Sequence, residues 1–448
     1  SMFSFIATTT RTIKMKISMP LLSSFWLMME KLIYISVSLI VSIALARYLE
    51  PELFGRLHYL LALTSIVAPI MTLGLNSILS REVLHRPLDT TYILGSGIVL
   101  RFIAGLATAV ISTWLAAYFL GSVEHTLFSI LVISSMFNAA LVVDFWFQAR
   151  NANLYGVIVR LVTLFIFSAA RLWAIQLNAG LAVFIVLSAL EFIGLALLYL
   201  LAYHRIGSGI DKLRVSFSES RRLLKEGRWL FLSGIAAVMY LKVDQIMLGS
   251  MQGDQAVGIY SAAIRISEVW YFIPAAIMTA FFPQLVTKKS RNQTGYVADL
   301  QRLNDVLITI AALVAVVITL IADWFLPMLF GREYMDAVPI LVVHIWAGLF
   351  VFMRSLLSKW LIVENYLKLS LLSQVLGATV NVVLNILLIP RYGPLGAAYA
   401  TLVSYAVAAY GVLLLHPNLW PMAAIVTRSM LLPYRIVRKG YRLYQARY

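Results

Sequence analysis

The chain has 448 residues, of which 61% are hydrophobic and 12% charged, and it carries a formal net charge of +16 and no cysteine. A soluble domain contains about 45–50% apolar and about 25% charged residues. The composition therefore excludes a soluble globular protein and indicates a chain that sits in lipid. The missing cysteines exclude a disulfide framework and a thiolate metal site.

The basic residues alternate with long apolar runs, whereas a nucleic-acid-binding protein gathers them on one face of a soluble domain. We therefore expect the lipid bilayer as a partner, and no nucleic acid. Ser1 before Met2 resembles a purification scar. The run ALA at residues 44–46 resembles a signal-peptide cleavage site, but the apolar run before it begins late and carries Glu30 and Lys31. We expect a retained first helix.

Runs of apolar residues predict the secondary structure, because a membrane-spanning helix needs about 20 of them and lipid cannot satisfy exposed backbone groups. Twelve such runs lie at 21–49, 56–79, 92–120, 126–148, 154–175, 179–204, 229–252, 257–287, 303–326, 337–362, 366–389 and 395–416. The sequence therefore predicts an all-α polytopic membrane protein with twelve transmembrane helices.

The distribution of Lys and Arg between alternate loops predicts the orientation, because cytoplasmic loops carry an excess of both. Most of these residues fall in one set of loops, which includes the interval 205–228 and the C-terminal tail. The opposite set holds only Arg47, Arg56, Arg332 and Arg391. This bias supports an even number of spans, with the N- and C-termini in the cytoplasm.

The chain divides into two halves of six spans each. We expect an N-terminal bundle at 1–204, a cytoplasmic linker at 205–228, a C-terminal bundle at 229–416 and a basic tail at 417–448. Trp26 and Gly55 are spaced like Trp229 and Gly258, which suggests a parallel repeat about an axis along the membrane normal. The tail fits either an amphipathic segment on the anionic inner leaflet or a disordered anchor.

Charged side chains inside the spans are candidate functional residues, because each costs about 2.5–3.5 kcal/mol at a helix centre on insertion scales. The basic ones are Lys31, Arg101, Arg160, Arg171, Lys242, Arg265, Arg354 and Lys359, and the acidic ones are Glu30, Asp144, Glu191, Asp244 and Glu268. Arg171 and Lys359 lie near segment ends and can reach the interface with their long side chains.

The surplus of cations predicts a water-accessible cavity that receives an anion; structural ion pairs between helices are the alternative. We expect Arg265, Arg101, Lys31, Lys242 and Arg354 to bind the anion, and Glu268, Asp244, Glu30 and Glu191 to serve in coupling or gating. Arg265 and Glu268 are three residues apart and can share one face of a helix.

The sequence lacks common catalytic motifs, and we expect a transporter and no enzyme. The sequence contains no H-E-x-x-H, G-x-S-x-G or Walker A pattern. We expect no cofactor beyond a coupling ion, H⁺ or Na⁺. Trp146, Trp270 and Tyr271 are candidates for stacking on sugars, although an aromatic belt at the membrane interface is the favoured interpretation.

Four short segments carry a resemblance to a known family. The run ARYLEPELFG at 46–55 resembles the first periplasmic turn of polysaccharide repeat-unit flippases. DQIMLG at 244–249, followed by VGIYSAA at 257–263, is similar to the start of their second half. FPQL at 282–285 and YGPLGAA at 392–398 resemble the end of their eighth helix and the start of their twelfth. In order and spacing, the chain resembles an O-antigen-type flippase of the multidrug/oligosaccharidyl-lipid/polysaccharide exporter superfamily.

This resemblance implies two six-helix bundles around a central cleft in the bacterial inner membrane. It also implies a cargo of undecaprenyl-diphosphate oligosaccharide, moved to the periplasmic leaflet by alternating access. Arg265 and Glu268 match a basic–acidic pair on the eighth helix of related lipid II flippases, in which the basic member is thought to meet the diphosphate. The family's Leu-Gly-Pro turn is Leu49-Glu50-Pro51 here, a departure that concerns the outer gate.

The expected driving force is the membrane potential, coupling to H⁺ or Na⁺, or both. The expected partners include a polysaccharide polymerase and glycosyltransferases of the same pathway. Two other functions stay open. A multidrug antiporter of the same superfamily should prefer organic cations, which a positive cavity repels. A membrane-embedded glycosyltransferase or polymerase generally needs a long external loop, and the expected periplasmic loops are short.

Overall fold

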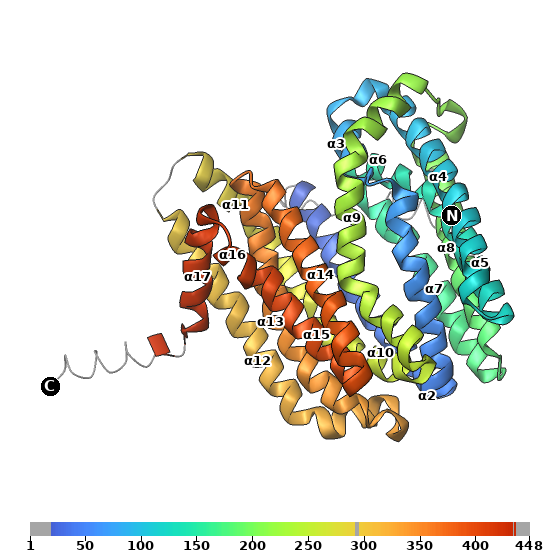
Figure 1. The fold of residues 1–448 in the computed structure, drawn as a ribbon. Coiled ribbons are helices and arrows are strands. Elements are labelled where there is room, and N and C mark those ends of the chain that lie inside the picture. Colours follow the sequence, from blue (N-terminus) through green and yellow to red (C-terminus); the bar gives the residue numbers. More distant parts are fainter. Residues whose placement is uncertain (1–18, 292–294, 433, 436–448) are drawn as a thin grey trace.

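The computed structural model describes residues 19–291, 295–432 and 434–435, and within them the fold is all-helical (Figure 1). The first half consists of α2 (Met19–Thr72), α3 (Asn76–His85), α4 (Thr90–Phe119), α5 (Ser122–Ser135), α6 (Asp144–Ala149), α7 (Asn153–Gln176) and α8 (Leu181–Ile206). The second half consists of α9 (Phe217–Gln252), α10 (Asp254–Glu268), α11 (Phe272–Ser290), α12 (Tyr296–Phe330), α13 (Ala337–Val363), α14 (Leu367–Tyr392), α15 (Pro394–Ala406), α16 (Val412–Leu414) and α17 (Trp420–Met430).

In the described part of the chain, the long apolar helices fit the twelve predicted membrane passes when the first, bent helix is counted as two. Among the described residues, eleven helices are long and apolar enough to span a bilayer, and the first of them covers Trp26–His85. This first helix is two helices joined at Glu50, whose backbone is non-helical with φ 59° and ψ 169°. Pro51 follows, and its fixed φ and missing N–H suit the first turn of a new helix. The prediction of an all-α polytopic membrane protein is confirmed.

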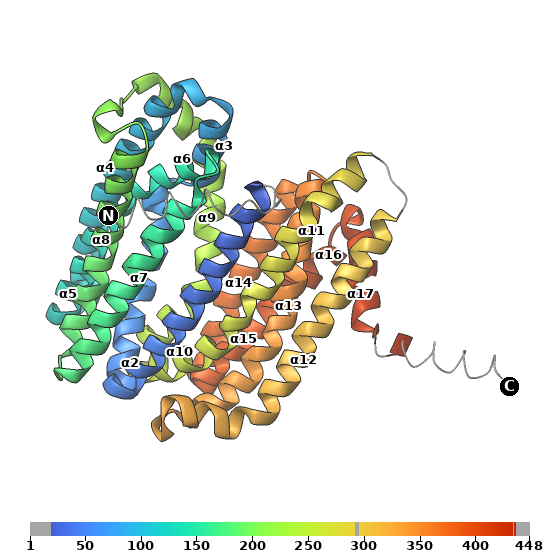
Figure 2. The ribbon, with the colours of Figure 1, turned by 180° about the vertical axis from the view of Figure 1, so that it is seen from behind.

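The helices form two groups that lie side by side (Figures 1 and 2). One group contains α3 to α8, the other α10 to α17, and α2 and α9 run between them. The tightest contact between the halves joins α2 to α10. Gly55 and Gly258 make it: a Cβ on Gly55 would lie 1.7 Å from the Asp254 carbonyl oxygen, so only glycine allows the two backbones to approach this closely.

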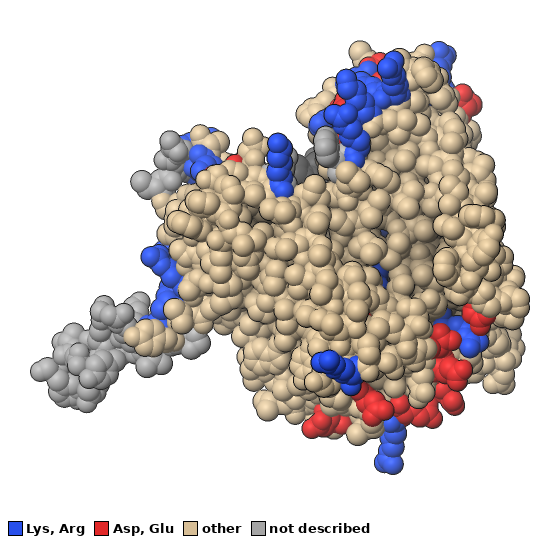
Figure 3. Space-filling view, viewed as in Figure 1, with Lys and Arg blue, Asp and Glu red and all other residues tan. Residues whose placement is uncertain are grey.

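The two ends of the molecule differ in charge (Figure 3). Lys and Arg gather at the end that carries α3 and the start of α9, which we call the basic end. Asp and Glu gather where α2 bends and α10 begins, which we call the acidic end. The wide tan band between the two ends matches the apolar faces of the spanning helices.

At the basic end, the second part of the predicted linker 205–228 is helical and is held by ion pairs. Residues 217–228 are the first three turns of α9, and an ion-pair cluster joins them to α3. Arg222 lies 2.8 Å from Glu82, Arg81 lies 2.6 Å from Glu226, and Arg86 lies 3.1 Å from Glu219. A hydrogen bond to Glu219 raises the pKa of Arg222.

The C-terminal region packs against the outside of the second half. The polar side chains of Gln301, Asn304 and Asp305 on α12 meet Ser429 of α17, with Ser429 Oγ 2.6 Å from Asp305. Arg435 also lies 3.1 Å from Asp305. The start of the predicted basic tail is therefore helical and docked, while residues 436–448 lie outside the described residues.

Candidate functional site

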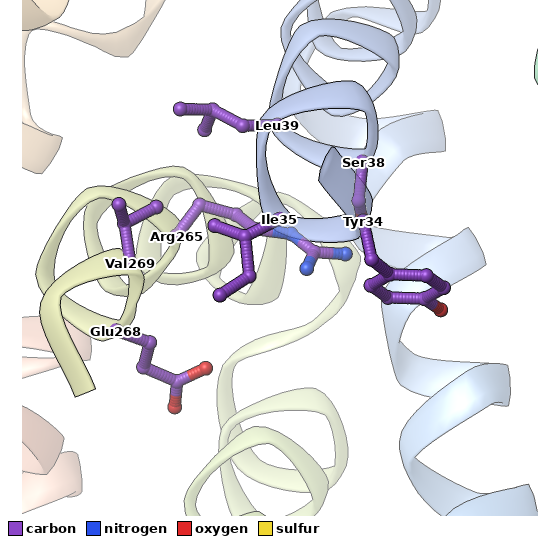
Figure 4. A pocket seen from close by; sticks show the side chains of 7 residues that line it. All are labelled: Tyr34, Ile35, Ser38, Leu39, Arg265, Glu268 and Val269. Carbon is purple, nitrogen blue, oxygen red and sulfur yellow. The ribbon is translucent and has the colours of Figure 1, made fainter. Parts of the chain in front are cut away.

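Arg265 lies beside a pocket between α2 and α10 (Figure 4). The pocket has a volume of about 160 Å³ and is lined by Tyr34, Ile35, Ser38, Leu39, Arg265, Glu268 and Val269. The guanidinium of Arg265 extends toward α2, whereas the carboxylate of Glu268 projects separately from the next turn of α10. The structure therefore places both residues of the predicted pair in one pocket.

This pocket lies deep within the membrane-spanning part. Arg265 is eleven residues from the start of α10, which corresponds to about 16 Å along the helix axis. It belongs to the 37-residue segment Asp254–Ser290, which is long enough to span the bilayer. A guanidinium at this depth needs a protein partner, a water-filled cavity or an anionic ligand.

Three of the predicted cations have no such protein partner. Within residues 19–291, 295–432 and 434–435, Arg265, Lys242 and Lys31 form no ion pair and no hydrogen bond. Arg265 and Lys242 both act electrostatically on His58 of α2, so the two cations lie near the same side chain. Figure 3 shows basic atoms in a hollow between the two halves, far from either charged end.

Arg101 and Arg354 are held differently, by neutral groups. Arg101 is 4% exposed, donates a hydrogen bond to Asn76 Oδ1, and has its guanidinium 5.9 Å from the ring of Phe145. Arg354 donates to Ser373 Oγ and to the carbonyl oxygen of Ala408 at 3.1 Å. Within the described parts of the chain, no contact joins either of them to the Arg265 pocket, so the structure does not bring all five predicted cations together.

Two of the predicted acids are already paired with arginines. Glu30 lies 2.5 Å from Arg160, which also lies 3.2 Å from Asp144. Glu191 lies 2.6 Å from Arg171. These contacts neutralise charges that would otherwise be costly in lipid. In this conformation both glutamates have the structural role that the sequence left open as an alternative.

Asp244 lies in a buried polar cluster of the second half. Its carboxylate accepts hydrogen bonds from Tyr260 Oη at 3.0 Å, Asn385 Nδ2 at 2.7 Å and Thr401 Oγ1 at 2.5 Å. Asn381 Oδ1 accepts from Asn385 at 2.9 Å and extends the cluster along α14. The four uncharged members were not among the predicted site residues, although Asn381 and Asn385 are spaced to share one face of an apolar helix.

At the acidic end, several contacts hold the two halves together. Arg56 of α2 donates a hydrogen bond to Asp254 of α10 at 2.7 Å. Tyr334, which is fully buried, donates to the carbonyl oxygen of Ala46 at 2.8 Å. Arg47 donates to the carbonyl oxygen of Leu329 at 2.6 Å. With the Gly55–Gly258 contact, they close the molecule at this end.

The three aromatic candidates lie in two different parts of the structure. Trp146 packs edge-on against Phe147 and Tyr203, in the interior of the first half. Trp270 and Tyr271 lie at the short 3₁₀ turn between α10 and α11, sixteen and seventeen residues from Asp254. This is about 24 Å along the helix from Asp254.

Comparisons with known proteins show the family and the fold of the chain. A sequence model of the family described as "Polysaccharide biosynthesis protein" matches residues 21–288. The probable low-salt glycan biosynthesis flippase Agl15 of Haloferax volcanii is 24% identical over 195 residues, which cover 43% of this chain and 41% of Agl15. The probable flippase AglR of the same organism is 26% identical over 204 residues, with coverages of 44% and 43%. The chain thus matches less than half the length of these two relatives.

A longer match is the capsular polysaccharide biosynthesis protein CapF of Staphylococcus aureus, 21% identical over 377 residues, with 82% of this chain and 92% of CapF covered. Among solved structures, the lipid II flippase MurJ in an inward closed conformation has a TM-score of 0.66 at 15% identity and covers 93% of this chain and 92% of its own. An inward-facing multidrug resistance MATE family transporter of the MOP superfamily has a TM-score of 0.61 at 13% identity, with coverages of 87% and 94%. The fold of this superfamily, predicted from the sequence, is confirmed.

Proposed function

The chain belongs to the polysaccharide biosynthesis protein family, and on this basis we propose that it is a flippase for lipid-linked oligosaccharide. Its cargo is an oligosaccharide repeat unit on undecaprenyl diphosphate, which it moves from the cytoplasmic to the periplasmic leaflet by alternating access. Two curated relatives are named as probable flippases, one of them of glycan biosynthesis. These names support the proposal.

The single observation that carries the proposal is the unpaired guanidinium of Arg265 in a pocket at mid-membrane depth. An arginine presents a planar set of N–H donors that matches phosphate oxygens, and the low dielectric of the site strengthens the contact. Lys242 lies close enough to act on the same histidine, and Lys31 lies on α2 one turn before Tyr34. We propose that these three cations bind the diphosphate, with Arg265 as the main contact.

We propose a different role for Arg101 and Arg354. Both already donate to neutral oxygen atoms in separate parts of the molecule. For either to bind cargo, these hydrogen bonds must exchange during the transport cycle. We therefore propose that they contact the diphosphate at a later stage than Arg265.

We propose that the basic end faces the cytoplasm, because cytoplasmic loops are enriched in Lys and Arg. Both termini then lie on the cytoplasmic side of the bacterial inner membrane. The contacts of Arg56, Tyr334 and Arg47 close the periplasmic side. The conformation described here is thus one that accepts cargo from the cytoplasmic leaflet.

The membrane potential can drive the movement of such a cargo. One charge crossing 100 mV is worth about 2.3 kcal/mol, so a diphosphate with about two negative charges gains about 4.6 kcal/mol on leaving a negative interior. We propose that Asp244 adds coupling to H⁺ or Na⁺, since its carboxylate is buried among the oxygen-bearing side chains of Tyr260, Asn385 and Thr401. Glu268, Glu30 and Glu191 remain candidates for this role, but two of them are ion-paired here.

In the pathway, the proposed flippase takes its cargo from glycosyltransferases on the cytoplasmic side and delivers it to a polysaccharide polymerase. The family description and the name of CapF support a place in polysaccharide biosynthesis. A physical contact with these enzymes is part of the proposal.

Binding to the purified protein tests the proposal. We would titrate undecaprenyl-diphosphate glycolipid and a panel of cationic drugs against the wild type, Arg265→Ala and the control Arg391→Ala, an exposed arginine at the acidic end of α14. Loss of a charge-assisted hydrogen bond costs about 1.5–3 kcal/mol, so Arg265→Ala should weaken glycolipid binding by about tenfold to a hundredfold. The control should bind like the wild type. Binding of drugs without binding of glycolipid would overturn the proposal and favour an antiporter.

A further inference from the structure

The Arg265 pocket contains polar and aromatic groups that a diphosphate alone does not use. Tyr34 is 46% exposed although it lies in a membrane-spanning helix, and its exposed surface lines the pocket. Ser38 lies one turn further along α2, and Glu268 contributes a carboxylate from α10 (Figure 4). An aromatic ring, a hydroxyl and a carboxylate thus surround the same space.

These groups have spare hydrogen-bonding capacity. In the part of the chain that the structure describes, the side chains of Tyr34, Ser38 and Glu268 form no hydrogen bond and no ion pair. A polar group in a spanning helix normally finds a partner, because lipid offers none. Their shared lack of partners indicates a polar ligand between α2 and α10.

A second observation lies immediately after Glu268. Trp270 Nε1 and Tyr271 Oη are both buried and have no hydrogen-bond partner among the described residues. Ser267, four residues before Tyr271 on the same helix face, is hydrogen-bonded to His344 Nδ1 at 2.8 Å and lies near the Tyr271 hydroxyl. Trp270 Nε1, which has no such neighbour, is therefore a further donor at the turn between α10 and α11, and a ligand that extends from the pocket can accept its hydrogen bond.

The chemistry of these groups matches a sugar. A pyranose ring has an apolar C–H face that packs on an aromatic ring and a rim of hydroxyls that donate and accept hydrogen bonds. A carboxylate accepts short, charge-assisted hydrogen bonds from hydroxyls. An organic cation fits less well, since the guanidinium of Arg265, one turn away on the same helix, offsets the charge of Glu268.

We propose that Tyr34, Ser38 and Glu268 form a saccharide subsite that holds the sugar attached directly to the diphosphate. This inference rests on the proposed function, because it places the phosphate on Arg265 and the first sugar beside it. The Tyr34 ring packs against one face of the sugar, and Glu268 and Ser38 bind its hydroxyls. Trp270 receives a group further along the glycan.

Two lipids distinguish this subsite from the phosphate site. We would measure binding of undecaprenyl-diphosphate glycolipid and of undecaprenyl diphosphate without sugar to purified wild type, Tyr34→Ala, Glu268→Gln and Arg265→Ala. Tyr118→Phe and Asp323→Asn serve as matched controls, since both residues are exposed and lie away from the pocket. A monodisperse elution profile and an unchanged melting temperature show that each variant is folded.

The proposed subsite predicts that the variants change the binding of the two lipids differently. Tyr34→Ala and Glu268→Gln should each weaken glycolipid binding at least tenfold. Binding of the sugar-free lipid should be unchanged in Tyr34→Ala. In Glu268→Gln it should be unchanged or tighter, because a negative charge is removed beside Arg265. Arg265→Ala should weaken both lipids. Equal changes on both lipids for Tyr34→Ala and Glu268→Gln would overturn the subsite while leaving the flippase proposal intact. Failure of the wild type to bind either lipid would overturn the flippase proposal itself.

Discussion

Gly55 and Gly258 face each other across the interface between the two halves. A Cβ on Gly258 would lie 1.8 Å from the carbonyl oxygen of Pro51 and 3.1 Å from the backbone nitrogen of Gly55. The spacing that pointed to an internal repeat thus marks a point of direct contact between the halves. The predicted repeat also matched Trp26 with Trp229, and the side chain of Trp229 lies outside the described part of the structure.

This contact predicts that Gly258→Ala prevents closure at the acidic end. Overpacking of a tight contact costs about 1–3 kcal/mol, and separation of the two backbones relieves it. The variant should therefore favour a conformation that is open at this end. Accessibility of a cysteine introduced at Ala256 or Ser261, measured with a membrane-impermeant thiol reagent, should rise. Gly180→Ala is the matched control, because nothing lies within 4 Å of the added Cβ; equal labelling of the two variants would contradict the prediction.

The backbone conformation of Glu50 predicts that Glu50→Gly stabilises the protein. Its φ of 59° with ψ of 169° belongs to a region that favours glycine, and a non-glycine residue there costs about 1–3 kcal/mol. Glu50→Gly should raise the melting temperature of the purified protein. Glu52→Gly should lower it, because Glu52 lies inside the helix, where glycine costs about 1 kcal/mol. A lower melting temperature for Glu50→Gly would show that the Glu50 side chain contributes more than its backbone strain costs.

The Glu30–Arg160–Asp144 contacts predict a strong dependence of folding on Arg160. Removing one partner of a buried ion pair costs about 3–5 kcal/mol, because the remaining charge is left uncompensated. Arg160→Met should therefore reduce the yield and melting temperature of the protein. Adding Glu30→Gln and Asp144→Asn to Arg160→Met should restore much of the loss. If the triple variant were no more stable than Arg160→Met, the contacts would not act as a charge balance.

Asp244 predicts an ion dependence of transport. Asp244→Asn keeps the size of the side chain and removes its charge. We expect flipping of fluorescent glycolipid in proteoliposomes to lose its response to an imposed H⁺ or Na⁺ gradient, while a response to membrane potential remains. Asp305→Asn, which disrupts the contact with Arg435 on the outside of the second half, should keep the gradient response. An unchanged gradient response in Asp244→Asn would exclude Asp244 as the coupling group.

The sequence was a good guide to the fold because the membrane imposes a simple rule. Each span needs a long apolar run, so twelve passes could be counted from hydropathy alone. The boundary between the halves was harder to predict. The interval 205–228 is polar and reads as a loop, yet its second part is helical because Glu219 and Glu226 find Arg86, Arg81 and Arg222 as partners.

For the candidate site, the sequence identified charged residues but not their partners. Arg265 and Glu268 could be grouped because they lie on the same helix. Whether Arg160 is paired or free depends on contacts with Glu30 and Asp144, which are 130 and 16 residues away in the chain. The buried amides and hydroxyls around Asp244 could not be predicted for a related reason. An uncharged polar residue in an apolar run is common, and only the packing of α9, α10, α14 and α15 shows that these side chains converge.

The helix α9 has a mechanical consequence. It starts at Phe217 among the ion pairs of α3 and runs without interruption to Gln252, which donates a hydrogen bond to the carbonyl oxygen of Ile389 in the second half. Its 36 residues form a single rod about 54 Å long. The halves are therefore not two bodies on a flexible tether. Any rocking of one against the other must bend this rod or detach its anchored end, so the elastic energy of one helix enters every transport cycle.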